Sequence, residues 1–576
     1  MKLTISTSKN AESFYISKSY KNNQGRSTTK TVRKLGTLKE LSEALCTDRD
    51  GVIAWAKEQV RIETEKYKTE KEANNIVINF KANEQMDYNM QKFFLGGYLF
   101  PQSVYYDLKL DYICKRIKAR HSFEYDLNAI LSDLVYTRIL EPDSKSSSYN
   151  TAKKLLETPT YELHDIYRAL AVLGDECDYI QSEVYKNSLI TVNRSNKILY
   201  YDCTNYYFEI EQEDENRKYG KSKEHRPNPI IQMGMFADGD GIPLAFSLFP
   251  GNQNEQKSLK PLEQKVIRDF GCNKFIYCSD AGLGSESIRE FNDIGARKFI
   301  VTQSIKKLKK EEKDWVLDTK GFKRISDGKE IEDISKIDPA DKDIYYKEAP
   351  YTPKKIHQTL IITYSPKYAA YQKSIREKQV ERANKMIADG HCRKTRKNPN
   401  DPGRFISQTA VTEQGEVADK KLYALDKEKV EDEAKYDGLY ALCTDLLDED
   451  PAEIIKVSEG RWQIEACFRN LKTDFKARPV YVRRDQSIKA HFLVCFLALL
   501  IYKIIEKKLG NKYTCDEILD TLKAVNFADI QEQGFIPLYE RTKITDDLHH
   551  ICGFRTDFNF ITKLKMRNIE KISKHH

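Results

Sequence analysis

The stretch from 196 to 304 constrains the fold most, because it places three β-prone runs in succession and then alternates helical and strand-like segments. The β-prone runs are KILYYDCTNYYFEI, PIIQMGMFADGDG and IPLAFSLFPGN, and the turn residues between them favour an antiparallel meander. After a helical segment, FIYCSD has the pattern of a short buried strand, GSESIREFNDIG that of a helix and KFIVTQ that of another strand. This order predicts a layered α/β architecture.

The length of the chain makes this α/β segment one part of a larger molecule. At 576 residues the chain exceeds the roughly 250–300 residues at which a single hydrophobic core stops growing. Hydrophobic residues make up 40% of it and charged residues 32%, which is typical of a soluble globular protein. We predict a hairpin and helix at 1–76, a helical region at 77–190, an α/β domain in two parts at 191–304 and 436–510, an insertion at 305–435 and a helical C-terminal region at 511–576.

Basic clusters occur in several of these regions. Residues 13–35 form two alternating, β-prone runs around Asn-Asn-Gln-Gly, and lysines and arginines are frequent in both runs. RSTTKTVRK, KRIKAR and HCRKTRKNPNDPGR could each neutralise phosphates. The net charge of +8 is modest, and for any single cluster a solvated surface is the simpler interpretation. Charge alone therefore permits nucleic-acid binding without establishing it.

Cysteine spacing and apolar runs point to a cytoplasmic protein. The closest pair of the 12 cysteines, Cys272 and Cys278, is too far apart for a Cys-x-x-Cys clip. The N-terminus MKLTISTSKN lacks the positive-then-apolar pattern of a signal peptide. FLVCFLALLIYKII at 492–505 is shorter than the ~20 apolar residues that a spanning helix needs. We expect a buried core helix there and no membrane partner.

Two acids stand at informative positions in the α/β segment. Strand alternation places Asp202 on one face with Tyr200, Thr204 and Tyr206, where a carboxylate is costly unless it is paired or binds a cation. The alternative is an edge-strand aspartate that faces water. Asp280 closes FIYCSD, and the carboxyl end of such a strand is where α/β sheets bind ligands. The alternative is an N-cap for the next helix, and the two roles can coexist.

A third acid lies in a helical segment further along the chain. At 100° per residue, Glu465 falls about 40° from Arg461 and about 20° from Lys472, so the three form a charged stripe. That stripe borders an apolar one formed by Ile464, Phe468, Leu471 and Phe475. The alternative is ordinary i, i+4 charge pairing between Arg461 and Glu465.

Two strand acids and one helix acid together offer oxygen ligands for Mg²⁺ or Mn²⁺. Two such ions can clamp the attacking and leaving oxygens of a phosphoryl displacement. Acids are common, so this spacing is a weak signal by itself. The identification of a metal site therefore depends on the sequence around the acids.

That surrounding sequence resembles the DDE transposases of bacterial insertion sequences. The matching segments are YYDCTNYYFE, GMFADGDGIPLAFSLFPGNQNE, FIYCSDAGLGS and GRWQIEACFRNLK, and they occur in the order that this family shows. The resemblance covers roughly 196–304 and 437–505, and more loosely the N-terminal part, including RILEPDSKSSSY. It implies a ribonuclease-H-like catalytic core interrupted by a β-containing insertion and preceded by a mostly helical region. It also implies that Asp202, Asp280 and Glu465 are the catalytic acids and hold two metal ions.

One branch of this family is marked by Tyr, two residues, Arg, three residues, Glu, six residues and Lys. Arg461, Glu465 and Lys472 match that signature, whereas Ser458 stands where the tyrosine is expected. The resemblance implies that the two cations bind DNA near the cleaved bond, and we add Arg469 of the same helix to the DNA-binding residues.

The expected function is that of a transposase which binds the terminal inverted repeats of an element and its target DNA. Metal-dependent cleavage and strand transfer would follow, carried out by a homodimer or larger assembly on nucleoid DNA. Two alternatives remain open. A domesticated nuclease with the same core would leave free ends only, and a catalytically inactive DNA-binding regulator would bind without Mg²⁺- or Mn²⁺-dependent cleavage.

Overall fold

The computed structural model describes residues 1–8, 11–21, 27–72, 85, 87–88, 90–390, 400–410, 421–530 and 533–575. The chain divides into two compact units, Met1–Met90 and Gln91–His576. The Asn-Asn-Gln-Gly turn predicted at 22–25 and residues 391–399 of the third basic cluster lie outside the described residues.

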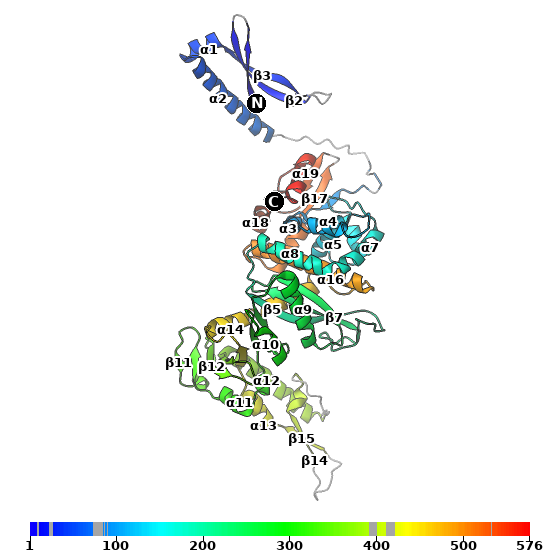
Figure 1. The fold of residues 1–576 in the computed structure, drawn as a ribbon, viewed down its shortest axis with the longest axis vertical. Coiled ribbons are helices and arrows are strands. Elements are labelled where there is room, and N and C mark those ends of the chain that lie inside the picture. The colour runs from blue at the N-terminus through cyan, green and yellow to red at the C-terminus, as the bar shows by residue number, and fades with distance from the viewer. Residues whose placement is uncertain are drawn as a thin grey trace. The chain divides into compact units, whose positions relative to one another are not determined.

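The first unit is a three-stranded antiparallel sheet with two helices (Figure 1). The predicted hairpin is present as β2 and β3, while β1, which pairs with β2, was not predicted. Thr37 caps α1 by accepting a hydrogen bond from the backbone nitrogen of Glu40, whose carboxylate accepts one from the backbone nitrogen of Thr37. Phe14, Leu41 and Val52 form the centre of a small core. The elements are β1 (Lys2–Thr7), β2 (Glu12–Lys21), β3 (Ser27–Thr37), α1 (Leu38–Leu45) and α2 (Arg49–Glu72).

The second unit begins with a short strand and six helices. The helical periodicity of the sequence predicts this part, and most of the side chains on α5 are buried. The elements are β4 (Phe93–Leu95), α3 (Leu99–Asp107), α4 (Leu110–Lys118), α5 (Leu127–Leu140), α6 (Lys145–Ala152), α7 (Leu163–Asp175) and α8 (Cys177–Thr191).

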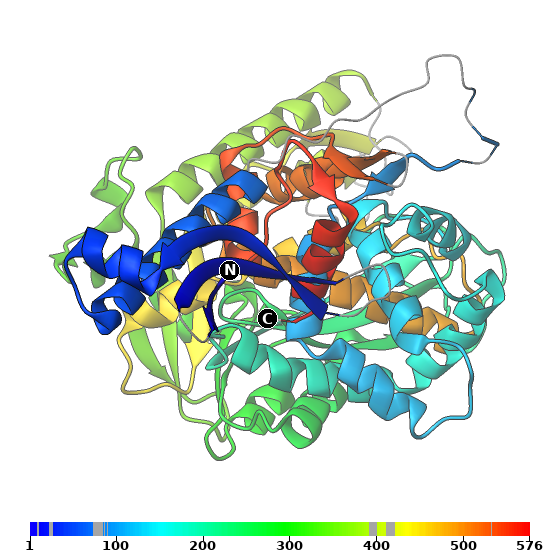
Figure 2. The same ribbon diagram turned by 90° about the horizontal axis from the view of Figure 1, so that it is seen from above.

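Helix α16 (Asp485–Lys508) packs against α5 and α7 of this helical part (Figures 1 and 2). It is long and apolar enough to cross a membrane by length and composition, but 89% of its most apolar window is buried inside the protein. The prediction of a buried core helix is therefore confirmed, with a longer span than 492–505.

A ten-stranded mixed sheet follows, in the order β11-β10-β12-β13-β16-β9-β8-β5-β6-β7. The predicted meander is present, since β5, β6 and β7 pair antiparallel. β8 pairs parallel with β5, and β9 parallel with β8, as the strand–helix alternation predicts. The elements are β5 (Ile198–Tyr207), β6 (Ile230–Asp238), β7 (Pro243–Pro250), α9 (Glu255–Phe270), β8 (Ile276–Ser279), α10 (Glu286–Asn292) and β9 (Lys298–Thr302).

Strand β5 is buried on both faces. Leu199, Tyr201 and Cys203 belong to the core under α9. Tyr200 and Tyr206 point to the opposite core, where the ring of Tyr206 lies 4.8 Å from that of Phe492 on α16. The even-numbered residues therefore share one face, as the alternation predicts, and Asp202 lies among them.

The insertion contains more strands than its sequence predicts. One strand, QTLIITYS, is expected, whereas the structure has β10 to β15. The other strands were missed because they have only two to seven residues, and FKR and YYKEAPY contain adjacent charged residues. β13 pairs with β16, and β16 with β9, so several of these strands extend the central sheet. The elements of the insertion are α11 (Lys310–Leu317), β10 (Phe322–Arg324), β11 (Glu330–Ile331), β12 (Tyr345–Tyr351), β13 (Gln358–Tyr364), α12 (Pro366–Ala388), β14 (Ile406–Ala410), β15 (Lys421–Leu425), α13 (Lys427–Ala434), and the short 3₁₀ turns Ile305–Lys307, Ile334–Lys336 and Pro402–Phe405. The second part of the α/β domain then begins with β16 (Leu439–Thr444).

The C-terminal region is mixed rather than helical. Its strands have two to five residues, too few for a period of two to be recognised in the sequence. They form a four-stranded sheet with β4 from the start of the unit, in the order β19-β18-β17-β4. The elements are α17 (Cys515–Ala524), β17 (Asn526–Ile530), β18 (Gly534–Pro537), α18 (Lys543–Cys552), β19 (Ile561–Thr562) and α19 (Lys563–Ile572).

A buried acid under the sheet makes the stability of the second unit depend on pH. Glu263 on α9 is fully buried, and burial raises its pKa from 4.5 to about 7. The folded protein therefore holds a proton that the unfolded chain loses, so this group makes stability fall as pH rises from about 4.5 to about 7.

We expect Glu263→Gln to raise the unfolding temperature at pH 8, by an amount equivalent to on the order of 2 kcal/mol, and to have little effect near pH 4.5. Thermal unfolding of both proteins across this range measures the difference, with Glu290→Gln on the surface of α10 as the control. A difference that does not change with pH would show that the carboxyl group does not titrate in this range.

Candidate active site

Strand register brings the two aspartates side by side. In the parallel pair of β5 and β8, Ile198 is opposite Ile276 and Tyr200 is opposite Cys278. Continuing that register by two residues sets Asp202 opposite Asp280, just beyond the last residue of β8. β5 lies between β6 and β8 inside the sheet, so the interpretation of Asp202 as an edge-strand residue facing water is wrong.

The surroundings of Asp202 oppose its charge. Burial raises its pKa to about 6, and the carboxylates of Asp280 and Glu255 act in the same direction. The ammonium group of Lys223 and a 2.7 Å hydrogen bond from the backbone nitrogen of Cys203 lower that pKa. A cation added at this point would relieve the repulsion between the carboxylates.

Asp280 organises the turn that follows β8. Its Oδ1 accepts a 3.0 Å hydrogen bond from the backbone nitrogen of Leu283. The N-cap of α10 is Ser285, so the interpretation of Asp280 as that cap is wrong. The side chain of Gln256, in the first turn of α9, donates to the carbonyl of Gly282 at 2.8 Å. The turn is thus tied to the N-terminus of α9 and leaves Asp280 exposed.

The helix that carries Glu465 packs across this sheet. It follows α14 (Pro451–Glu459) and is labelled α15 (Trp462–Thr473). Its predicted apolar stripe is confirmed, because Ile464, Phe468, Leu471 and Phe475 are all buried.

Close approaches to the turn after β6 and to β5 fix the position of α15. Gly241 has a φ of +74°, and a Cβ there would meet Gln463 of α15. A Cβ on Gly460, at the junction of α14 and α15, would clash with the hydroxyl of Tyr200 on β5. Both positions therefore need glycine for the helix to lie this near the sheet.

Arg461 lies beside Glu465 and within the electrostatic influence of Asp280. Its Nη2 lies 3.9 Å from Oε1 of Glu465, whose side chain is 63% exposed. Burial opposes the charge of Arg461, but Tyr440, Cys278 and Asp280 raise its pKa above the usual value. Arg461, directly before α15, and Glu465, in its first turn, therefore form the N-terminal end of the predicted charged stripe.

Lys472 is held by a partner that the sequence analysis did not predict. Its Nζ lies 3.3 Å from Oε1 of Glu224, and Arg478 approaches the other oxygen of that carboxylate at 2.8 Å. The ammonium group also lies 5.5 Å from the centre of the Tyr206 ring. Arg469 is exposed on the outer side of α15. Lys472 and Arg478 therefore form a pair of cations that share one internal carboxylate.

Four charged residues of the site were missed from the sequence: Lys223, Glu224, Glu255 and Arg478. Lys223 contacts the carbonyl oxygen of Cys203 and lies 3.4 Å from Glu255. Lys221 and Lys223 are anchored to β5 by hydrogen bonds of 3.1 Å with the side chain of Asn205. Glu255 stands in the quoted segment PGNQNE, which was the one available signal.

The donor set fits a hard divalent cation. Asp202 and Asp280 lie on neighbouring strands, with Glu255 close enough to Asp202 to affect its pKa. All three offer carboxylate oxygens, the ligands that Mg²⁺ and Mn²⁺ prefer. The raised pKa of Asp202 shows that its ionised form lacks full compensation from the protein alone.

Comparison with known proteins identifies the family. Residues 201–501, more than half of the chain, match the family described as the transposase DDE domain. The chain belongs to this family. As a DDE transposase it is a DNA-processing enzyme, and the family implies dependence on a divalent metal. The matched region begins one residue before Asp202 and includes Asp280, Glu465 and Lys472.

No curated protein matches this transposase significantly. Among solved structures it is similar to the piggyBac transposase in a cryo-EM structure of its synaptic complex with hairpin DNA. The sequence identity is 8% and the TM-score 0.36, over 85% of this chain and 87% of that one.

Proposed function

We propose that this transposase binds the terminal inverted repeats of an insertion sequence, cuts the DNA there and joins the ends to target DNA. The observation that carries the proposal is the placement of Asp202 and Asp280 side by side on β5 and β8, with Arg461 3.9 Å from Glu465 and within the electrostatic influence of Asp280. The strand order supports a ribonuclease-H-like core, in which an antiparallel meander (β5, β6 and β7) is followed by two parallel strands (β8 and β9).

Asp202, Asp280 and Glu465 would hold two ions, Mg²⁺ or Mn²⁺. When bound, such ions stabilise the charge that develops on the oxygens of a phosphodiester during its displacement. Arg461 would orient the carboxylate of Glu465 and lower the repulsion at Asp280. Lys472 and Arg478 would neutralise a DNA phosphate beside the acids, with Arg469 contacting the backbone further out. The spacing of Arg461, Glu465 and Lys472 supports membership in the branch of the family with the Tyr-Arg-Glu-Lys signature.

The first unit supports a role in recognising the ends of the element. Lys30, Arg33 and Lys34 are exposed on β3, and the unit has a core of its own. The KRIKAR cluster is a weaker candidate than its sequence predicts, because Arg116 is paired with Glu183 at 3.2 Å and Arg120 with Glu176 at 2.7 Å. Binding two ends at once would require at least a dimer.

A fragment covering residues 1–72 is expected to bind duplex DNA with an affinity that falls at least tenfold between about 50 mM and about 200 mM salt. Replacing Lys30, Arg33 and Lys34 by glutamine should weaken that binding strongly. Replacing the exposed Lys57 and Lys66 on α2 should weaken it less. Fluorescence anisotropy measures both effects. A folded fragment without salt-sensitive affinity would move end recognition to the second unit.

The reaction products test the proposed function. The full-length protein is incubated with Mg²⁺ or Mn²⁺, a target plasmid and duplexes from the DNA that flanks its coding sequence. Joined target DNA supports the transposase proposal. Free ends without joining would favour a domesticated nuclease, and binding without cleavage would favour an inactive regulator.

A further inference from the structure

The guanidinium group of Arg461 is fixed by two hydroxyl groups. Its Nη1 donates to Oγ1 of Thr302 at 2.7 Å and to the hydroxyl of Tyr440 at 3.1 Å. The two hydroxyl groups are themselves 2.5 Å apart. Thr302 is the last residue of β9, and Tyr440 lies on β16. The guanidinium is therefore held where the ends of two neighbouring strands meet the start of α15.

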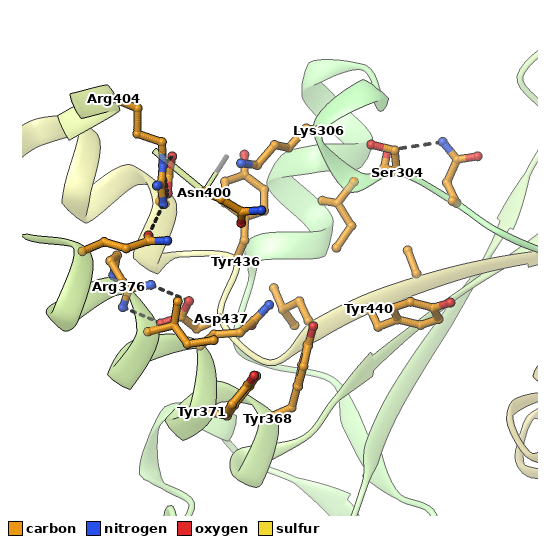
Figure 3. A pocket seen from close by; sticks show the side chains of 18 residues that line it. Ser304, Lys306, Tyr368, Tyr371, Arg376, Asn400, Arg404, Tyr436, Asp437 and Tyr440 are labelled. Atoms are coloured by element: carbon orange, nitrogen blue, oxygen red, sulfur yellow. Dashed lines mark hydrogen bonds and ion pairs between the residues drawn. The ribbon is translucent and has the colours of Figure 1, made fainter. Parts of the chain in front are cut away.

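Tyr440 reaches this point from the insertion side of the sheet. Its strand pairs with β9 and β13, and the side chain lies at one end of a cavity of about 480 Å³ (Figure 3). Tyr368, Tyr371 and Arg376 line other parts of this cavity, and Arg376 is paired with Asp437. Tyr440 is 36% exposed, so its ring is not fixed by a tightly packed core. Its hydroxyl contacts account for its orientation.

Ser458 adds an independent observation. Its side chain is buried and lines a second cavity, of about 230 Å³, that Tyr440 also lines. This is the position at which the signature has a tyrosine. The short serine leaves space between α14 and β16, and the hydroxyl of Tyr440 on β16 contacts Arg461.

We propose that Tyr440 is a positioning residue for DNA cleavage, which holds Arg461 beside the metal-binding acid Glu465. The inference rests on the proposed function. Strand β16, at the start of the second part of the α/β domain, thereby contributes directly to the active site, because it carries the hydroxyl that orients Arg461. Arg461 has one edge of its guanidinium committed to the two hydroxyl groups, and the other faces Glu465.

The test is single-turnover cleavage of pre-bound DNA by the full-length protein with Mg²⁺. Tyr440→Phe keeps the ring and removes one hydrogen bond to a charged group, so we expect cleavage about tenfold slower with DNA affinity unchanged within about twofold. Tyr364→Phe, on the neighbouring strand β13, is the matched control and should cleave at the wild-type rate. The unfolding temperature of both variants should stay near that of the wild type.

A double-mutant cycle shows whether Tyr440 acts through Arg461. If it does, Tyr440→Phe has no further effect in an Arg461→Ala background. Equal rates for wild type and Tyr440→Phe, or a full additional loss in the Arg461→Ala background, would overturn the inference. Failure of the wild-type protein to cleave any DNA would instead count against the proposed function, so the two failures are distinguishable.

Discussion

Asp202→Asn, Asp280→Asn and Glu465→Gln are each expected to slow metal-dependent cleavage by on the order of 10³-fold or more. Each substitution keeps the volume of the side chain and removes a charged oxygen ligand, and metal stabilisation of a phosphoryl displacement contributes several kcal/mol. DNA affinity should stay close to that of the wild type. The measurement is the single-turnover rate on pre-bound DNA, so that differences in binding do not enter.

The control for these three variants is Glu453→Gln on α14, whose carboxylate is 65% exposed and pairs only loosely with Lys456 at 3.7 Å. It should cleave at the wild-type rate. Burial opposes the ionised form of Asp202. Removing its charge in Asp202→Asn should therefore not lower the unfolding temperature of the metal-free protein. Near-normal cleavage by any of the three variants would remove that residue from the catalytic set.

Lys472→Ala is expected to slow cleavage by roughly 10²-fold, the loss typical of removing one preorganised charge-stabilising group. Lys472→Arg should rescue only part of the rate, because a planar guanidinium differs in reach from a compact ammonium. DNA affinity should change little, because other basic residues hold the rest of the duplex. The same single-turnover measurement applies.

Glu224→Gln separates this role of Lys472 from a purely structural one. The variant breaks the ion pair but leaves the lysine and Arg478 in place. If Lys472 neutralises a phosphate, Glu224→Gln should cleave within a few-fold of the wild-type rate and bind DNA at least as tightly. Equal losses of cleavage rate in Glu224→Gln and Lys472→Ala would show that the lysine serves only to hold the segment around Glu224.

The central sheet could be predicted well from the sequence because its signals are local. Alternation along KILYYDCTNYYFEI places Tyr200 and Asp202 on one face of the strand, and the structure buries Tyr200 there, with its hydroxyl donating to the carbonyl of Val457 on α14. The positions of β8 and β9 follow from short apolar runs bounded by turns. The strands of the insertion and of the C-terminal region were mostly missed, since two to seven residues with frequent charges give no clear period.

The site was only partly predictable, for a physical reason. Asp202 could be proposed from strand alternation, Asp280 from its position at the carboxyl end of a strand, and both from the resemblance of the surrounding sequence. Glu224, Arg478 and Tyr440 reach the site through contacts between distant parts of the chain, and no local pattern encodes such contacts. Lys472 was correctly placed on its helix, but its partner could not be inferred. The periodicity of a helix describes α15 alone, so it does not reveal the segment around Glu224 that packs beside Lys472.

The most direct test of the central claim is the location of Mn²⁺ in crystals of the protein bound to cleavage-competent DNA, determined by anomalous scattering. We predict a peak within ligand distance of both Asp202 and Asp280, a second beside Glu465, and the loss of at least one peak in Asp202→Asn. Full occupancy of Mn²⁺ at other acids, with no peak between Asp202 and Asp280, would contradict the account.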